Sequence, residues 1–266
     1  MNKSIKDILV IDDEQVILDS VVKIGGSEGF TVDSADNGQA ALEKLEGNDY
    51  RLIVSDIMMP VMDGFALLDE LSSRNISTPV IMTTGYSTFD NAVNSLYRGA
   101  IDFIPKPFSI EELVSAINRG IKYSGIIKQE GAGGASELLP YVPCPSKYFR
   151  IGYSCWVYSS GKNSAVIGIT DLFNKTIDTI TGIELVQPGD QINQANYAIK
   201  IETGSDLLHQ VYSPISGKVV AVNDKLLEDF SILEKDPYFE GWIYQVEPAD
   251  FDNEIKNLIP CCSDRV

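Results

Sequence analysis

The sequence predicts an α/β doubly wound fold with a five-stranded parallel sheet, followed by a mainly-β sandwich domain. Two observations support this. Up to about residue 123, short apolar runs alternate with stretches in which apolar residues recur every three or four positions, as in strands interleaved with helices. After residue 145, apolar and polar residues alternate with a period of two between turn residues, as in an antiparallel β module.

Five apolar runs define the strands of the first half. They are DILVI at 7–11, FTVDS at 30–34, RLIVS at 51–55, PVIMT at 79–83 and DFIPK at 102–106. The last helix has a clear start, because Ser109 with Glu112 three positions later fits a capping box. Its apolar stripe is formed by Ile110, Leu113, Val114, Ile117 and Ile121.

The segment 125–145 breaks this rhythm. It contains Gly-Ala-Gly-Gly-Ala-Ser at 131–136 and then three prolines. We therefore predict a first domain at 1–124, a flexible linker at 125–145 and a second domain at 146–266. The predicted strands of the second domain are CWVYSS, NSAVIGIT, IELVQ, ANYAIKIE, KVVAV and GWIYQVE, accompanied by one or two short helices.

The charge balance argues against nucleic acid as a partner. The formal net charge is −17, with 11 basic against 19 acidic residues in 1–128 and 10 against 19 in 129–266. Neither half has the basic surface that phosphate-backbone binding needs, and no helix-turn-helix pattern is seen, so a DNA-binding transcription factor is disfavoured.

Cellular location and cysteine usage give weaker expectations. No apolar run approaches about 18 residues and no signal-peptide pattern is seen, so we expect a cytoplasmic protein that does not enter a membrane. The cysteines are Cys144, Cys155 and the adjacent pair Cys261-Cys262, without metal-ligand spacing. We expect them to be structural thiols.

Charged and hydroxyl side chains follow the predicted strands at the edge where open α/β sheets bind ligands. They are Asp12 and Asp13 after the first strand, Asp56 after the third, Thr84 at the fourth and Lys106 at the fifth. Three carboxylates at one edge need a counter-ion, and Mg²⁺ takes oxygen ligands. Asp56 is then the candidate nucleophile for an acyl phosphate. Lys106 and the metal would neutralise the phosphoryl oxygens, and Thr84 would donate its hydroxyl.

The motifs VIDDE, ADNGQAAL, SDIMMPVMDGF, PVIMTTG and AIDFIPKPF follow one another in order. In these motifs residues 5–122 resemble a response-regulator receiver domain of bacterial two-component signalling, which has a flavodoxin-like fold. The resemblance implies that a sensor histidine kinase phosphorylates Asp56. It also implies that Asp12, Asp13 and Asp56 hold Mg²⁺ together with the backbone carbonyl of Met58.

Three further positions take roles from the same resemblance. Phe103 falls where the family keeps its switch aromatic, which turns inward on phosphorylation; simple core packing remains open as the alternative. Met58 and Tyr86 lie two residues past the phosphoacceptor and the threonine. We expect them to set the access of water to the phosphoryl group.

The second half shows the segments Trp156-Val157, VIGITDLF, IELVQPGD, YSPISGKVVAVND and DPYFEGWIYQVEPAD, in that order. In these segments residues 147–259 resemble the H protein of the glycine cleavage system, a relative of lipoyl and biotinyl domains. In that family a lipoyl group rides on a lysine at a hairpin tip. Counting back from Tyr212, the tip falls at Ser205 or Asp206, and neither can form the amide bond. Lys200, inside a predicted strand, is the alternative attachment site.

The resulting functional prediction is a phosphorylation-controlled response regulator. It catalyses only its own phosphorylation and dephosphorylation, and its degenerate, non-lipoylated H-like domain binds an unidentified protein target. The alternative is a regulated lipoyl-type carrier or a decoy linked to glycine cleavage and lipoate metabolism. A homodimer through the apolar stripe of the last helix also stays open.

Three side chains of the second half are expected to be structural. His209, the one histidine, lies in a strand-like run, so we interpret it as a structural imidazole rather than a phosphotransfer residue. Trp156 and Trp242 are expected to be core or rim aromatics of the sandwich.

Overall fold

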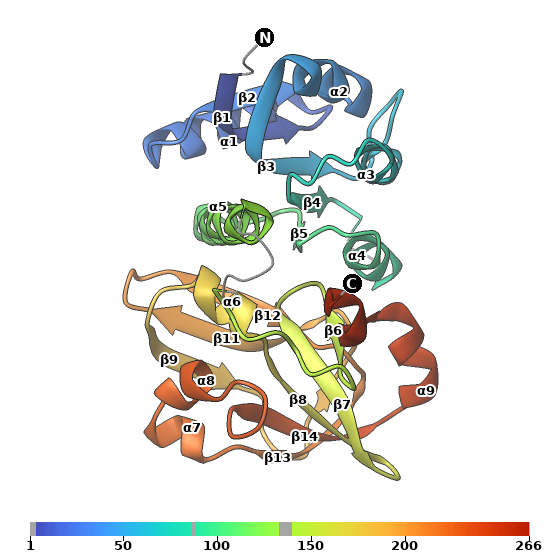
Figure 1. Cartoon of the computed structure of the whole chain (residues 1–266), viewed down its shortest axis with the longest axis vertical. Coiled ribbons are helices and arrows are strands. Elements are labelled where there is room, and N and C mark those ends of the chain that lie inside the picture. The colour runs from blue at the N-terminus through green and yellow to red at the C-terminus, as the bar shows by residue number, and fades with distance from the viewer. Residues whose placement is uncertain (1–3, 87–88, 133–139, 266) are drawn as a thin grey trace. The chain divides into compact units, whose positions relative to one another are not determined.

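The computed structural model describes residues 4–86, 89–132 and 140–265. The chain forms two compact units, the first mainly from the N-terminal half of the sequence and the second mainly from the C-terminal half (Figure 1). Within the described ranges, no helix combines the length and the apolar character that a membrane crossing requires.

The first unit is built on a parallel sheet with the strand order β2-β1-β3-β4-β5. Its strands are β1 (Ser4–Ile11), β2 (Val32–Ala35), β3 (Asn48–Asp56), β4 (Val80–Thr84) and β5 (Asp102–Pro105). Helices cover both faces of such a sheet, so its central strands must be apolar throughout. Residues Ile8 to Ile11 of β1 are accordingly at most 1% exposed. The predicted doubly wound five-stranded sheet is confirmed.

The helices of the first unit are α1 (Gln15–Ser27), α2 (Gly38–Gly47), α3 (Gly64–Ser73), α4 (Phe89–Tyr97) and α5 (Ile110–Ala132). Figure 1 shows α1 and α5 on one face of the sheet and α2 and α3 on the other. The predicted capping box of α5 is confirmed, because the Ser109 N–H donates to Glu112 and the Glu112 N–H donates to the Ser109 hydroxyl.

Helix α5 extends beyond the predicted first domain. It continues to Ala132, so residues 125–132, which we assigned to the linker, are helical. Glycine lowers helix propensity without abolishing it, and the intervening residues of Gly-Ile-Ile-Lys-Gln-Glu are mostly good helix formers. The remaining glycines and Ser136 of the predicted linker lie in 133–139, outside the described residues.

The apolar stripe of α5 belongs to the core. Leu113, Val114, Ile117 and Ile121 are buried, and only Ile110 is exposed, at 60%. On the same helix, a Cβ added to Gly120 would lie 2.6 Å from Leu52 Cδ1 of β3, so the helix packs closely on the sheet. The stripe is therefore not the open apolar surface that the predicted homodimer needs.

The second unit consists of two antiparallel sheets. The larger has the order β10-β13-β14-β8-β7-β6-β15 and the smaller the order β12-β11-β9. The strands are β6 (Phe149–Ile151), β7 (Cys155–Gly161), β8 (Ser164–Ile169), β9 (Ile180–Leu185), β10 (Gln191–Ile192), β11 (Tyr197–Thr203), β12 (Leu208–Tyr212), β13 (Gly217–Val222), β14 (Trp242–Pro248) and β15 (Ile259–Pro260). The Tyr244 hydroxyl of β14 donates to the Ala198 carbonyl of β11 at 2.7 Å and so joins the sheets. The predicted mainly-β sandwich is confirmed.

The second unit has more short helices than we predicted. They are α6 (Asp171–Thr176), α7 (Lys225–Glu228), α8 (Ser231–Lys235) and α9 (Phe251–Glu254), with the 3₁₀ turns η1 (Ile255–Asn257) and η2 (Cys261–Arg265). Helices of four to six residues span fewer than two turns, which is too short to show a 3.6-residue period in the sequence.

Trp156 fills the centre of the large sheet. Its side chain is fully buried, and its indole N–H donates to the carbonyls of Ile169 and Pro237 at 2.9 and 3.1 Å. On the neighbouring strand β8, a Cβ at Gly168 would overlap the indole ring, so only glycine leaves the ring its space. Trp242 is partly buried against the same cluster. Both tryptophans therefore have structural positions.

Candidate functional site

The candidate site lies at the carboxyl ends of the strands in the first unit. Asp12 directly follows β1, Asp56 is the last residue of β3, and Thr84 is the last residue of β4. The strand order reverses between β1 and β3, which is where doubly wound sheets bind their ligands. Folding thus brings Asp12 and Asp56 together from opposite sides of this switch point.

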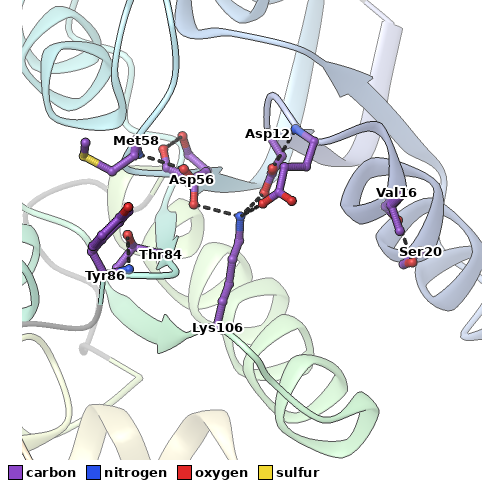
Figure 2. A network of polar contacts seen from close by, with 10 residues as sticks. Asp12, Val16, Ser20, Asp56, Met58, Thr84, Tyr86 and Lys106 are labelled. Atoms are coloured by element: carbon purple, nitrogen blue, oxygen red, sulfur yellow. Dashed lines mark hydrogen bonds and ion pairs between the residues drawn. The ribbon is translucent and has the colours of Figure 1, made fainter.

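Lys106 connects the two aspartates. It follows β5, and its ammonium nitrogen lies 2.7 Å from Asp12 Oδ2 and 2.9 Å from Asp56 Oδ1 (Figure 2). The Lys106 side chain is 11% exposed, and the carboxylates are 2% and 4% exposed. A third acid, Glu14, lies 3.6 Å from the ammonium but is mostly exposed. The centre of the site is therefore one buried cation between two buried anions.

The two oxygens of Asp56 differ in their partners. Oδ2 accepts a hydrogen bond from the Met58 N–H at 2.7 Å. Oδ1 is buried and makes an ion-pair contact with the Lys106 ammonium at 2.9 Å. The Met58 N–H thus holds one oxygen of the carboxylate, and the Lys106 ammonium faces the other.

Burial and the neighbouring charges shift the pKa values of the site's ionisable groups in opposite directions. Burial raises the pKa of both Asp12 and Asp56, and the neighbouring Lys106 offsets only part of this rise. The charge of Asp13 adds to the upward shift at Asp56. For Lys106, burial works to lower the pKa, but its two aspartate partners outweigh burial and the net shift is upward. The carboxylates are therefore short of positive charge.

A divalent cation fits this shortage of charge. Mg²⁺ binds through one or two carboxylates and keeps several waters, and the carboxylates of Asp12 and Asp56 are suitable ligands. Of the three carboxylates that the sequence predicted to converge, the structure buries Asp12 and Asp56 beside Lys106. Asp13 is exposed, but it lies close enough for its charge to act on Asp56. Among the described residues, no three acidic, histidine or cysteine side chains form a complete cation cage. The donors thus fit a largely hydrated Mg²⁺.

The remaining predicted residues of this edge differ in exposure. Thr84 is fully buried, and its hydroxyl oxygen accepts a hydrogen bond from the Tyr86 N–H at 3.2 Å (Figure 2). Tyr86 and Met58 are 71% and 56% exposed, so both side chains stand at the solvent boundary of the site. The predicted metal-binding role of the Met58 carbonyl stays a prediction, since the contact described here is made by its N–H.

Phe103 does not start from an exposed position. The ring lies on β5 and is 3% exposed. The receiver resemblance implied a ring that turns inward on phosphorylation, but this ring is already inside. A buried ring fits the core-packing alternative that the sequence left open, and the predicted switch role of Phe103 stays a prediction.

In the second unit, the structure places the predicted hairpin tip between β11 and β12. Thr203 N–H donates to the Leu207 carbonyl and Asp206 N–H donates to the Thr203 carbonyl, which closes a tight turn. Ser205 and Asp206 are exposed at its end, and Asp206 has a φ of 58°. The tip thus presents short polar side chains without an amine.

Lys200 and His209 lie on the strands of this hairpin and not at its tip. Lys200 is on β11, where its ammonium pairs with Glu184 of β9 at 3.0 Å. His209 is on β12 opposite Ile201 and is 2% exposed. Lys200 is therefore placed inside a sheet and His209 is buried, as expected of residues with structural roles.

One residue of the first-unit site was missed by sequence reasoning. Gly64 begins α3, and a Cβ there would overlap the backbone carbonyl of Asp56. The signal was the Asp63-Gly64 pair in the motif SDIMMPVMDGF, which we used only for the resemblance. Because residue 64 has no side chain, the N-terminus of α3 can pack directly against the end of β3, where Asp56 lies.

The fold and site define an α/β module with an acidic switch-point site, followed by a β-sandwich whose predicted hairpin tip carries Ser205 and Asp206 and no lysine. The family model of the response regulator receiver domain matches residues 8–118, and that of the glycine cleavage H-protein matches residues 147–261. The chain belongs to the response regulators through its first half and to the glycine cleavage H proteins through its second.

Curated relatives match each half separately. Transcriptional regulatory protein FixJ of Bradyrhizobium diazoefficiens is 36% identical over 139 residues, covering 50% of this chain and 68% of FixJ. DNA-binding transcriptional regulator NtrC of Escherichia coli is 33% identical over 148 residues, 54% of this chain and 32% of NtrC. Probable glycine cleavage system H protein 1 of Saccharolobus solfataricus is 39% identical over 104 residues, 39% of this chain and 75% of that protein. The chain thus spans about a third of NtrC.

Proposed function

We propose that this chain is a two-component response regulator in which a sensor histidine kinase phosphorylates Asp56, and in which the H-like unit is a protein-binding output. The observation that carries the proposal is the buried Asp56 Oδ1, which lies 2.9 Å from the buried Lys106 ammonium. A carboxylate oxygen in this position is a nucleophile beside a fixed positive charge.

Each residue of the site has a defined part in this chemistry. Oδ1 of Asp56 attacks the phosphorus of the kinase's phosphohistidine, and the P–N bond breaks as the imidazole leaves. The Met58 N–H holds the other oxygen and so fixes the carboxylate orientation. Lys106 neutralises charge on the phosphoryl oxygens, and Thr84 donates its hydroxyl to one of them after exchanging its present contact with Tyr86. Asp12, Asp56 and, from the solvent side, Asp13 would hold Mg²⁺, which supplies further charge neutralisation.

The chain would catalyse only the formation and loss of its own aspartyl phosphate. Its output would be a change in protein binding, because the second unit offers neither a lysine at its hairpin tip nor a basic surface. FixJ and NtrC are named as transcriptional regulators, but the region of this chain that follows the receiver is an H-like unit of net acidic composition. We therefore propose a protein target and no nucleic acid.

Phosphoryl labelling tests the proposed nucleophile. The chain is incubated with labelled acetyl phosphate and Mg²⁺, and the acid-stable, hydroxylamine-sensitive label is counted. Wild type and Asp36→Asn, an exposed aspartate two strands away, should incorporate label equally, and Asp56→Asn should fall to background. Undiminished labelling of Asp56→Asn would refute the assignment.

The output is tested with a partner search that depends on the phosphorylation state. Full-length protein treated with beryllofluoride and Mg²⁺ is compared with Asp56→Asn under the same treatment as bait in the host lysate. A protein retained differently by the two baits supports a phosphorylation-controlled output. Identical retention of every bound protein contradicts it.

The carrier alternative depends on whether any lysine accepts a lipoyl group. Lys200 lies inside strand β11 and not at the hairpin tip, which argues against it as the attachment site. With a lipoate–protein ligase, lipoate and ATP, the intact mass of the wild type should not change. Ser205→Lys places an amine at the hairpin tip. Position 205 is chosen because Asp206 has a positive φ, which a lysine would adopt only with strain. Lipoylation of this variant would show that the tip lacks only the lysine. A lipoyl adduct on the wild-type protein would show that the second unit is a lipoyl carrier and would contradict the proposed protein-binding output.

A further inference from the structure

Two cysteines that are far apart in the sequence meet inside the second unit. Cys144 and Cys261 are 117 positions apart, and their sulfurs lie 2.7 Å from each other. Both are buried, at 4% and 0% exposure. The other two cysteines are Cys155, which is buried on β7, and Cys262, which is exposed.

Backbone hydrogen bonds fix the positions of Cys144 and Cys261 without any bond between their sulfurs. Cys261 N–H donates to the Tyr148 carbonyl at 3.0 Å, and Pro260 of β15 is paired with Phe149 of β6. On the other side, a turn in which Tyr148 N–H donates to the Pro145 carbonyl fixes the residue next to Cys144. The chain is thus already shaped to keep the sulfurs together, which is the requirement for a low-strain disulfide.

The pair lies in the aromatic core of the unit. Tyr148, Trp156 and Tyr238 pack in the same cluster as the two cysteines. Sulfur packs well against aromatic rings, so the cluster accepts either the two thiols or a disulfide of nearly equal volume. Nothing in the proposed signalling chemistry uses these residues.

We propose that Cys144 and Cys261 are a redox modification site that closes into an intramolecular disulfide when the protein meets a peroxide. One thiolate attacks a peroxide oxygen, forming a sulfur–oxygen bond as the O–O bond breaks, and the departing oxygen leaves as water. The second thiol then attacks that sulfur, the sulfur–oxygen bond breaks, and a second water leaves. Two electrons pass from the thiol pair to one peroxide, and both thiol protons end in water.

The structure also provides a route for the oxidant. Strand β15 has only two residues and lies at the edge of the large sheet, so it can open locally at less cost than the central strands. Opening of β15 exposes Cys261 without unfolding the sheet. Burial raises the pKa of the Cys155 thiol in the sheet centre, so Cys155 stays a protonated and unreactive thiol.

The proposed disulfide would close one covalent loop around the β unit. Residues 145–260 include every strand from β6 to β15. In the chain-entropy account, a cross-link that closes a long loop stabilises by restricting the unfolded chain, so the stabilised region would be the second unit alone. The receiver site of the first unit would keep its chemistry.

Peptide mapping is the direct test. Full-length reduced protein is treated with hydrogen peroxide, alkylated without reduction and digested. The expected product is a Cys144–Cys261 cross-linked peptide, with Cys155 and Cys262 carrying the alkyl group. Cys262→Ala is the matched control and should give the same cross-link. Cross-links that use Cys262, or alkylation of both Cys144 and Cys261 after complete exposure to peroxide, would overturn the proposal.

Tryptophan fluorescence gives a second readout that does not depend on the map. Both tryptophans of the chain belong to the second unit, and Trp156 packs in the cysteine cluster. Oxidation should quench the emission and raise the melting midpoint of this unit by about 5 °C or more. Cys144→Ala and Cys261→Ala should melt at the same temperature with and without peroxide. An unchanged wild-type midpoint and emission would contradict the proposal even if either variant folds poorly.

Discussion

Lys106 and Lys200 make the same kind of contact in the two halves of the molecule, with different consequences. Lys106 is 11% exposed and lies between two buried aspartates. Lys200 is 43% exposed and pairs with Glu184, which is 74% exposed. Both pairs join side chains from different strands at about 3 Å. The comparison teaches that burial, and not the ion pair itself, separates a chemical site from a surface contact.

The largest expected difference follows from removing each lysine. Lys106→Met leaves two buried carboxylates without their cation, so the free energy of unfolding of the first unit should fall by about 3 kcal/mol. Lys200→Met removes an exposed pair and should cost at most about 1 kcal/mol in the second unit. Urea unfolding checks both, with far-UV circular dichroism for the first unit and tryptophan fluorescence for the second. Equal costs would break the comparison.

An intermediate effect is expected from tight packing in the second unit. Gly168→Ala introduces a Cβ that overlaps the Trp156 ring, so we expect a loss of about 2 kcal/mol. Gly161→Ala is the matched control on the neighbouring strand β7, because no atom lies within 4 Å of its added Cβ. Tryptophan fluorescence during urea unfolding measures both variants. A loss in the control as large as in Gly168→Ala would show that backbone effects, and not the indole, set the cost.

The smallest effect concerns pH. Burial works to raise the pKa of Asp33, but hydrogen bonds from Lys6 and Tyr50 outweigh it and hold the pKa below its ordinary value. The Asp33 carboxylate therefore binds a proton more readily in the unfolded chain than in the folded one. Its contribution to the free energy of unfolding is present above about pH 4 and is lost as pH falls through the folded-state pKa.

This gives a measurable contrast. At neutral pH, Asp33→Asn should lower the free energy of unfolding of the first unit by about 1 kcal/mol, and the difference from wild type should narrow below pH 4. In the second unit, Glu240 is exposed and pairs with the exposed Lys225, so Glu240→Gln should show no resolved change in the free energy of unfolding at any pH. Denaturant midpoints between pH 3 and 7 test both variants; a difference at Asp33 that widens in acid would contradict the sign.

Sequence patterns predicted the parts of the fold that are long and periodic. The five parallel strands follow buried apolar runs, and the acidic residues that end β1 and β3 could be read directly. The end of α5 was missed because Gly125 and the glycines after it indicate a loop, although helical hydrogen bonding continues to Ala132. The two-residue strands β10 and β15 are too short to leave any pattern.

Within the site, the sequence predicted which chemical groups come together, but it did not predict which of them are buried. It could not show that Asp13 faces solvent while Asp12 is buried one position earlier, because both follow the same strand. It could not show that Phe103 is already inside. The contact of Cys144 with Cys261 was beyond reach, because 117 residues separate two thiols without any spacing rule. Such contacts depend on the register of distant strands.

The Trp156–Gly168 contact also bears on how the second unit can change over generations. The indole occupies the volume that any side chain at 168 would need. A larger residue at 168 is accommodated only after the ring at 156 becomes smaller, whereas a smaller ring leaves a gap until 168 fills it. The two positions are therefore expected to vary together among descendants of this chain, and a lineage that has lost the tryptophan should be the one in which the glycine is also replaced.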